Sequence, residues 1–222
     1  MIDFESSFAS AFVKCFPDAE ISGCHFHFGQ RIWRKVQSVG LQVRYGQDSN
    51  FVLSIKMLVA LAFVPVDDVI NAFETLTQSE YFSEDNESVE SVLGYFETTW
   101  IGSLDRRKRR RSPCFPIYMW NCYDAVVNDL LRTNNAVEGW HRAFNERVRI
   151  SHASINKFIN VLKSEQSTLE LLIAQSRAGR KVQNKKRKKY ADYDKRLKNV
   201  VLGYIGANIL EYLCEVANNI TL

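Results

Sequence analysis

The sequence predicts a mostly helical α+β protein. Apolar residues recur at helical spacing along nearly the whole chain, whereas only residues 21–28 alternate in the way a half-buried strand does. The 222 residues include only ten Gly and four Pro, which is few for a β-sandwich or a low-complexity chain. One strand cannot form a sheet by itself, so either its partner strands lie outside this chain or the chain does not fold independently.

The first forty residues are predicted to form a helix, the strand and a second helix. Pro17 ends the first helix, and Gly29 breaks the strand that follows. Within that strand, Cys24 and His27 fall on opposite faces. The second helix is expected to end at Gly40, because glycine suits the position after a helix C-cap. Four phenylalanines spaced four residues apart mark one face of the first helix: Phe4, Phe8, Phe12 and Phe16.

Beyond residue 48 the spacing predicts helices that are separated by short polar segments. Residues 79–86 are acidic and residues 105–116 are basic, and both stretches are predicted to be loops. The helical stretches are about 51–62, 69–76, 89–100, 120–130, 137–148, 155–173 and 190–216.

Several classes of protein are excluded by composition and motifs. The longest apolar stretch, residues 57–66, is much shorter than the roughly 20 residues of a membrane span, so no membrane partner is expected. No charged and then apolar leader follows Met1, and the five cysteines are scattered and odd in number, as in reduced intracellular proteins. Glycine loops for nucleotides are absent, so no small-molecule substrate is expected.

The net charge of +4 conceals an acidic half and a basic half. Residues 1–100 hold 6 Lys and Arg against 14 Asp and Glu, a net charge of −8. Residues 101–222 hold 23 against 11, a net charge of +12. This asymmetry favours a polyanionic partner for the basic half, although a solvated basic surface is a common alternative.

Two basic clusters lie in the second half of the chain. They are Arg106, Arg107, Lys108, Arg109, Arg110 and Arg111, and Lys185, Lys186, Arg187, Lys188 and Lys189. Each cluster suits a nuclear-localisation signal or a patch that contacts nucleic-acid phosphates, and solvated loops are a third explanation. Two clusters in one basic half favour a nucleic-acid or nuclear role.

Two acids are candidates for chemistry. Asp3 directly precedes the first helix, and its position alone favours a helix N-cap over a catalytic role. Glu138 shares a polar helix face with Asn134 and His141. A carboxylate in that setting can bind a divalent metal ion while Asn134, Asn135 and His141 hold it in place. An ordinary solvated face with Asn135 as the helix cap explains the pattern equally well.

Cys24 and His27 have the C-x-x-H spacing of half a zinc site. No second Cys/His pair follows at zinc-finger spacing, and a regular strand would separate the two side chains unless it bends. His141 is the remaining candidate for a third ligand. Two partly buried core residues are the simpler interpretation, and a structural Zn²⁺ site is the alternative.

Six segments taken in order carry a resemblance to a known family. They are Ile2–Glu5, Gly23–Gln30, Trp33–Gln37, Ala60–Pro65, Tyr95–Gly102 and Arg132–His141. Together they resemble the catalytic domain of Mutator-like element (MULE) transposases, from residue 2 to about 175 and more loosely to the end. The resemblance is in the combination, since no single segment is specific.

The resemblance implies the C-terminal part of an RNase H-like fold with a large helical insertion. Residues 1–47 would form a partial RNase H-like βα core. Residues 48–131 would be the insertion, with the basic loop 105–116 inside it. Residues 132–222 would be C-terminal helices that include the one bearing Glu138.

The resemblance also implies a DDE-type DNA transposase, in which three acids bind Mg²⁺ or Mn²⁺ for DNA cleavage and strand transfer. Asp3 would be the second acid, which reverses the cap interpretation, and Glu138 the third, with their carboxylates within about 8 Å of each other. Cys24 and His27 would be the family's C-x-x-H motif. The first acid would lie on a strand before Met1, so we expect an N-terminally truncated chain that is inactive as given.

By the same resemblance the partners would be DNA at transposon ends and further copies of the chain, in the nucleus. The alternative is a transposon-derived nuclear module without enzymatic activity, which binds DNA or another protein through its basic half.

Overall fold

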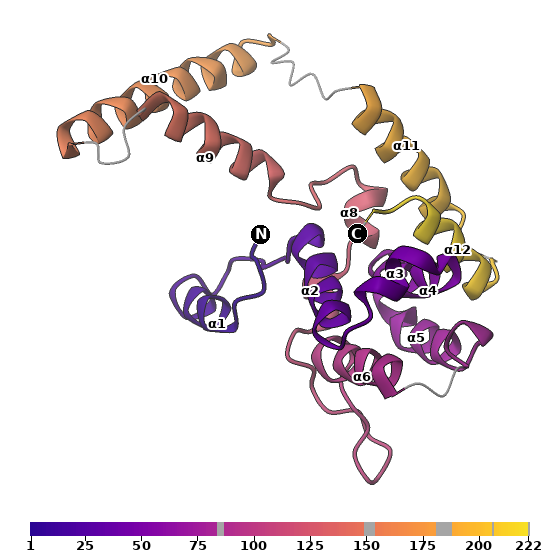
Figure 1. Cartoon of the computed structure of the whole chain (residues 1–222). Coiled ribbons are helices and arrows are strands. Elements are labelled where there is room, and N and C mark those ends of the chain that lie inside the picture. Colours follow the sequence, from indigo (N-terminus) through magenta and orange to yellow (C-terminus); the bar gives the residue numbers. More distant parts are fainter. Residues whose placement is uncertain (84–86, 149–153, 181–187, 206, 222) are drawn as a thin grey trace. The chain divides into compact units, whose positions relative to one another are not determined.

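The computed structural model describes residues 1–83, 87–148, 154–180, 188–205 and 207–221 (Figure 1). The chain divides into two compact units, Met1–Thr133 with Asp192–Leu222, and Asn134–Ala191. We call them unit 1 and unit 2. The prediction of a mostly helical chain is confirmed. Among the described residues, strand pairing is limited to two isolated bridges, one parallel between Ile2 and Gly23 and one antiparallel between Leu104 and Arg110.

The helices follow one another in both units. Unit 1 contains α1 (Ser6–Cys15), α2 (His25–Ser38), α3 (Gln42–Gln47), α4 (Ser49–Ala60), α5 (Val69–Thr77), α6 (Glu87–Phe96), α7 (Ile117–Trp120), α8 (Tyr123–Val127) and α12 (Ile209–Asn218). Its short helical turns are η1 (Leu61–Phe63), η2 (Val66–Asp68), η3 (Glu80–Phe82) and η4 (Glu97–Ile101). Unit 2 contains α9 (Asn135–Val148) and α10 (Ile155–Arg177), and α11 (Lys188–Leu202) begins in unit 2 and ends in unit 1.

The predicted strand over residues 21–28 is wrong, because α2 begins at His25. Cys24, Phe28, Ile32 and Val36 are all fully buried, and their spacing of four residues is that of one helix face. Phe26, which the strand would have buried beside Cys24, is 50% exposed. The four-residue spacing of the buried side chains therefore determines the structure here, and Gly29 lies inside α2 instead of ending a strand.

The predicted end of this helix at Gly40 is confirmed. Gly40 has φ +80, the left-handed region that glycine adopts without strain. Its N–H donates to the Gln37 carbonyl at 3.0 Å, and the Leu41 N–H donates to the Val36 carbonyl at 3.0 Å. This pair of hydrogen bonds is a Schellman motif, which satisfies carbonyls that the helix end leaves without partners.

The first helix begins later than predicted, so Asp3 is not its cap. Helix α1 starts at Ser6 with Glu5 at the N-cap position, and no side chain caps it. Phe4 lies outside the helix with φ +60 and is only 1% exposed, so it belongs to the core. Phe8 lies in α1 and Phe16 is its C-cap residue, and both side chains are more than half exposed.

Helix α4 is the centre of unit 1. It packs against α2, α3, α5 and α12, and its last four residues, Met57–Ala60, are at most 1% exposed. A helix that is covered on every side has apolar residues around its whole circumference. This explains the apolar stretch 57–66, and among the described residues no helix is both long and apolar enough to cross a membrane.

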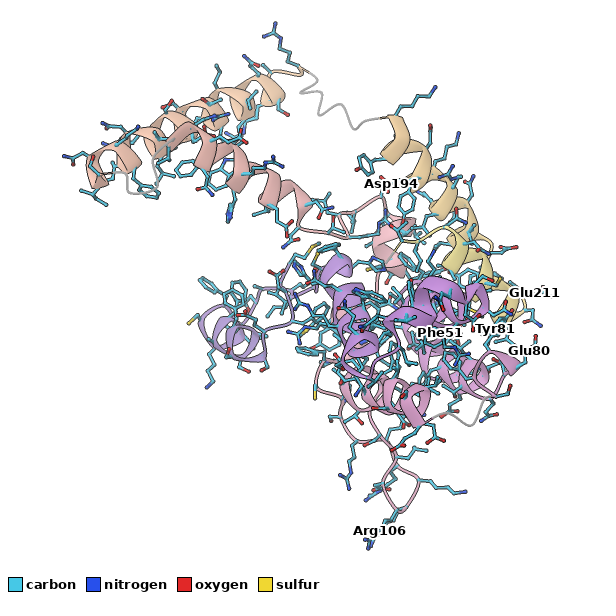
Figure 2. All side chains as sticks on the ribbon, in the orientation of Figure 1. Phe51, Glu80, Tyr81, Arg106, Asp194 and Glu211 are labelled. Atoms are coloured by element: carbon cyan, nitrogen blue, oxygen red, sulfur yellow. The ribbon has the colours of Figure 1, made fainter. Side chains whose placement is uncertain are left out.

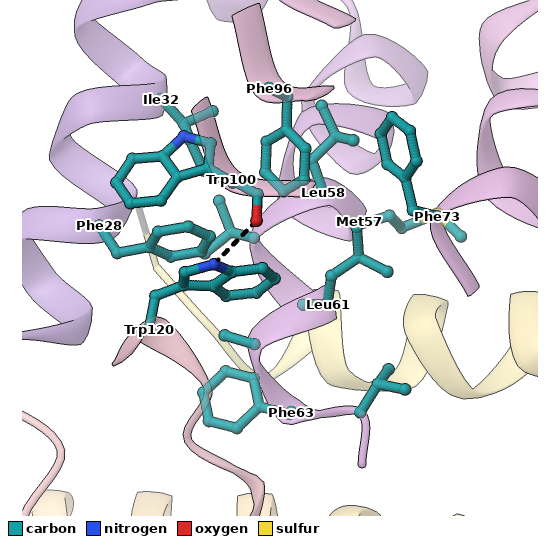
Figure 3. Close-up of a cluster of buried hydrophobic side chains, with 14 of the residues drawn as sticks. Phe28, Ile32, Met57, Leu58, Leu61, Phe63, Phe73, Phe96, Trp100 and Trp120 are labelled. Carbon is teal, nitrogen blue, oxygen red and sulfur yellow. Dashed lines mark hydrogen bonds between the residues drawn. The ribbon is translucent and has the colours of Figure 1, made fainter. Parts of the chain in front are cut away.

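A cluster of aromatic rings joins several segments of unit 1, and Figure 3 shows Phe28, Trp100 and Trp120 within it. Phe28 of α2 stacks on Trp120 of α7, with ring centroids 4.9 Å apart and planes within 8°. Trp100 of η4 meets Phe28 edge-on at 4.8 Å and Phe4 at 5.0 Å. Such edge-on and stacked pairs add about 0.5–1.5 kcal/mol each beyond the burial of apolar area. Three of the six segments that carry the resemblance therefore contribute rings to one core.

Unit 2 is built on the contact between α9 and α10. Phe144 of α9 is 7% exposed and meets Phe158 of α10 edge-on at 5.6 Å. Glu165 of α10 is also buried; its carboxylate accepts from Trp140 Nε1 at 3.3 Å and pairs with Arg147. Residues 1–47 and 48–131 lie together in unit 1. The boundaries predicted at residues 47 and 131 come from the resemblance to a family and stay predictions.

Candidate functional site

Two segments that are distant in the sequence meet beside Asp3. The Cys24 N–H donates to the Ile2 carbonyl at 2.9 Å, which forms the parallel bridge between Ile2 and Gly23. Glycine is required at this bridge, because a Cβ on Gly23 would lie 2.1 Å from Phe4 Cζ. The tight approach fixes Asp3 next to the start of α2.

The Asp3 carboxylate lies against His27. Asp3 Oδ1 is 3.0 Å from His27 Nδ1, the distance of an ion pair when the imidazole is protonated. His27 Nδ1 is buried and makes no hydrogen bond of good geometry among the described residues. The side chain of Asp3 is 50% exposed and that of His27 is 19% exposed. Asp3 is thus held on one side by a ring and faces solvent on the other, where a hard cation could bind.

A positive charge also approaches the backbone around Asp3. The Arg31 guanidinium, one turn beyond His27 on α2, donates to the Phe4 carbonyl at 2.6 Å. It also lies over the Phe115 ring, 5.6 Å from the centroid. Arg31 was not among the candidate residues predicted from the sequence. Its spacing of four residues from His27 is the signal that would have found it, once the segment is known to be helical.

Cys24 and His27 occupy the first turn of α2. Cys24 is its N-cap residue and is fully buried. Residues three apart on a helix lie on the same side, so the separation expected from a strand does not apply. Among the described residues, however, no three His, Cys, Asp or Glu side chains gather as metal ligands. Binding of Zn²⁺ by Cys24 and His27 stays a prediction, as does binding of Mg²⁺ or Mn²⁺ by Asp3 and Glu138.

His25, a partly buried neutral imidazole, was not among the candidates predicted from the sequence. Burial, and secondly the Arg132 charge, lower the pKa of His25 to about 3. Its ring lies 4.8 Å from that of Phe63, and its Nε2 is buried without a hydrogen-bond partner in the described part of the chain. The predicted strand hid this burial, because it placed His25 and Phe28 on opposite faces.

Arg132 ties the start of α2 to α11. Its carbonyl accepts from the His25 N–H at 2.9 Å, and its guanidinium pairs with the Asp194 carboxylate. The same guanidinium lies 5.9 Å from the centroid of the Tyr193 ring. Only 16% of the Arg132 side chain is exposed, so this cation has a structural role.

Glu138 lies in the first turn of α9, in unit 2, and is exposed. Its N–H donates to the Asn134 carbonyl at 3.0 Å. His141, one turn further, is exposed and meets Trp140 edge-on at 5.2 Å. Asn135 is the exposed first residue of α9. The predicted polar face therefore exists, and Asp3 and Glu138 belong to different units, so their convergence stays a prediction.

The predicted basic loop is a folded turn, which we call the basic hairpin (residues 103–111). The Arg111 N–H donates to the Ser103 carbonyl at 2.9 Å, and Leu104 bridges to Arg110. Asp105 Oδ1 accepts from the backbone of Arg109 at 2.9 Å and of Arg107 at 2.7 Å. These bonds, chiefly the one from Arg109, lower the pKa of the Asp105 carboxyl. An ionised aspartate therefore holds the turn closed.

The six cations of this run differ in their surroundings. Arg110 is held by Glu97 at 3.0 Å and Glu74 at 2.5 Å, with its side chain 16% exposed. Arg109 pairs with Asp105 at 3.2 Å but remains 70% exposed. Four further cations are exposed: Arg106, Arg107, Lys108 and Arg111. Arg106 lies at the end of the hairpin that is farthest from the helices of unit 1 (Figure 2).

The second basic cluster falls mostly outside the described residues. Lys185, Lys186 and Arg187 are not among them, and neither is the side chain of Lys189. Lys188 is the exposed first residue of α11. Its role in binding nucleic acid stays a prediction.

Comparison with protein-family models, curated proteins and solved structures gives no match to this chain.

Proposed function

We propose that this chain contributes two of the three acids of a DDE-type transposase, and that its substrate is DNA. Asp3 and Glu138 would be these acids, and Mg²⁺ or Mn²⁺ would be the cofactor. The part of the chain around Asp3 would be the edge of an RNase H-like sheet, and α4 to α8 would belong to the helical insertion. The protein would act in the nucleus as a multimer.

The observation that carries this proposal is the contact of Asp3 with His27. Two segments selected by the resemblance, Ile2–Glu5 and Gly23–Gln30, pack together although α1 lies between them. A parallel pairing across a helical crossover is the arrangement of a βαβ unit. Ile2, α1 and Gly23 have that order and that direction of pairing, which supports a sheet edge at Asp3.

The residues present suit a hard divalent cation. Carboxylate oxygens are its preferred ligands, and the Asp3 and Glu138 side chains both reach solvent. When bound, two such ions activate an attacking hydroxyl and stabilise the leaving oxygen at phosphorus. His27 would orient the Asp3 carboxylate, as outer residues commonly do for metal ligands. Two acids alone would hold an ion loosely, so we propose that activity needs the third acid on a preceding strand.

Metal binding by the whole chain tests this assignment. Electron paramagnetic resonance of Mn²⁺ measures the free ion as protein is added. We expect Asp3→Asn and Glu138→Gln each to weaken binding at least about tenfold, since each removes a charged ligand. Glu146→Gln is the matched control, because Glu146 is an exposed acid on the same helix α9. Equal binding by Glu138→Gln and Glu146→Gln would contradict the proposal.

A non-enzymatic nuclear module is the second candidate function, and the basic hairpin favours it. The hairpin is built entirely from residues of unit 1 and needs neither Glu138 nor a metal ion. A chain that binds DNA with equal affinity in the presence of a chelator, and that binds no Mn²⁺, would favour this candidate over the transposase.

A further inference from the structure

We infer that the basic hairpin is a folded element that docks into the major groove of duplex DNA, and that it does not act as a linear nuclear-import signal. The inference shares with the proposed function the assumption of a DNA partner. It concerns binding alone, and it requires neither Asp3 nor Glu138.

The turn is closed from within by Asp105. Its Oδ1 accepts two backbone N–H groups, from Arg107 and Arg109, and its Oδ2 accepts Nε and a terminal nitrogen of Arg109, both at 3.2 Å. The Asp105 N–H donates in turn to the Arg109 carbonyl at 2.8 Å. Lys108 completes the turn with φ +57. One carboxylate thus satisfies four donors, and the peptide cannot become extended while it does so.

The base of the hairpin is fixed to the helices of unit 1. Arg110 donates to Glu97 of η4 and Glu74 of α5, and also to the Gly102 carbonyl at 2.7 Å. Gly102 has φ +95, and a Cβ there would lie 1.9 Å from the Arg111 carbonyl oxygen. The two arms of the hairpin therefore approach at Gly102 more closely than any other residue would allow. These contacts fix the direction in which the hairpin projects from the helices of unit 1.

The cations divide into anchors and exposed groups. Arg110 is paired with two carboxylates, those of Glu74 and Glu97. Arg106, Arg107 and Lys108 are exposed, and Figure 2 shows Arg106 at the tip. Arg111 adds an exposed cation at the base. The acid within the tip, Asp105, is already bonded to Arg109. The tip therefore presents cations on a narrow ribbon, which is the charge pattern that polyanionic phosphates attract.

A linear signal is disfavoured because peptide signals are bound as extended segments whose backbone is accessible. Here the run is closed by Asp105 and held at its base by Glu97 and Glu74. Extending it would break both sets of charge-assisted hydrogen bonds.

Duplex DNA fits the shape better than duplex RNA does. The major groove of B-form DNA admits a two-stranded ribbon, and its walls are lined with phosphates. The corresponding groove of A-form RNA is deep and too narrow for side chains to enter. We therefore expect the hairpin to contribute to DNA affinity and to contribute little to RNA affinity.

The first experiment measures fluorescence anisotropy of the full chain with a labelled 30-base-pair DNA duplex, in chelator, from 50 to 200 mM salt. We compare R106Q/R107Q/K108Q with K14Q/R34Q/K195Q, a control that removes three exposed cations elsewhere in unit 1. Each lost phosphate contact reduces the slope of log affinity against log salt concentration by about 0.9. If three contacts are lost, the decrease in affinity from 50 to 200 mM salt should be about 40-fold smaller for the hairpin variant than for the wild type. Equal slopes for the two variants would overturn the inference.

The second experiment uses Asp105→Ala, for which the two interpretations predict opposite signs. This substitution makes the chain more positive, so an unstructured cationic run would bind DNA more tightly. A docking hairpin loses its turn and should bind at least about fivefold more weakly. Unchanged melting temperature shows that unit 1 remains folded. Tighter binding by Asp105→Ala would overturn the inference.

The third experiment separates nucleic-acid classes and separates this inference from the proposed function. With an RNA duplex of the same length, R106Q/R107Q/K108Q should bind like the wild type, and an equal loss on both duplexes would overturn groove docking. Glu138→Gln should bind DNA like the wild type in chelator. Failure of the Mn²⁺ test with success here would discard the transposase assignment and keep the hairpin.

Discussion

Trp120 Nε1 donates a 3.1 Å hydrogen bond to the backbone carbonyl of Trp100, and both side chains are fully buried (Figure 3). Trp100 lies near the end of η4, where the last carbonyls of a helix lack partners along the chain. The indole of α7 therefore satisfies a buried backbone group of η4, and one side chain joins two segments of the core through both packing and polarity.

Trp120→Phe should destabilise unit 1 by about 2 kcal/mol or more. The ring remains aromatic, but the Trp100 carbonyl loses its donor, and a buried unpaired carbonyl costs about 1–3 kcal/mol. Chemical denaturation measures the change in the free energy of unfolding. Tyr118→Phe is the control, because Tyr118 is 65% exposed and its change should stay within about 0.5 kcal/mol. Equal effects would show that the hydrogen bond contributes nothing.

His25 should make stability depend on pH below neutrality. Burial lowers its folded-state pKa to about 3 from 6.5, so the unfolded chain binds the extra proton first. The contribution is complete above about pH 6.5 and is lost as the pH falls toward 3, by at most about 1.4 kcal/mol per pH unit. Unfolding measured from pH 4 to 7 should give a flatter profile for His25→Gln. His141→Gln, at an exposed histidine, should keep the wild-type profile.

Two glycines should respond in opposite directions to alanine. Gly102→Ala places a Cβ against the Arg111 carbonyl oxygen at a positive φ, so it should destabilise the chain by at least about 1 kcal/mol. Gly94 lies inside α6 with open space around its Cβ position, so Gly94→Ala should stabilise by about 0.5–1 kcal/mol. Thermal unfolding of both variants tests the pair, and a stabilising Gly102→Ala would refute the described turn.

Four of the five thiols should divide into two classes in a modification assay. Cys15 and Cys114 are exposed and should react with a thiol reagent in the native protein. Cys24 and Cys122 are buried, and burial raises the pKa of Cys122 to about 12. Because a thiol reagent cannot reach a buried side chain, both should react only after denaturation. In the Cys122→Ser variant, Cys24 is the remaining buried thiol of this pair. Fast labelling of Cys24 in the native variant would contradict the packing at the start of α2.

The helices were predictable where one face is buried. Phe51, Ile55 and Leu58 have the spacing of a helix and lie in the core, as the pattern indicates. The segment 21–28 was not predicted, because five alternating residues match a strand locally. The deciding signal is the continuation from Phe28 to Ile32 and Val36, which only a longer window captures.

The candidate site was predictable in its residues and not in its contacts. The resemblance singled out Asp3 and His27, but nothing in the spacing of 24 residues indicates that their side chains meet. The basic run was visible as charge. The distinction between Arg110 and Arg106 depends on Glu74, which is 36 positions from Arg110 in the chain, and such pairings are set by tertiary packing.

Helix α12 packs along α4, and its Tyr212 hydroxyl donates to the Phe63 carbonyl. The centre of unit 1 is therefore closed by residues synthesised about 150 positions after it, whereas unit 2 is a continuous stretch of chain. During translation the apolar face of α4 stays uncovered until α12 has left the ribosome, although unit 2 is already complete by then. Unit 2 is encoded between the two parts of unit 1, so it can fold before the core around α4 is closed, and the face of α4 that α12 covers is exposed to aggregation until then.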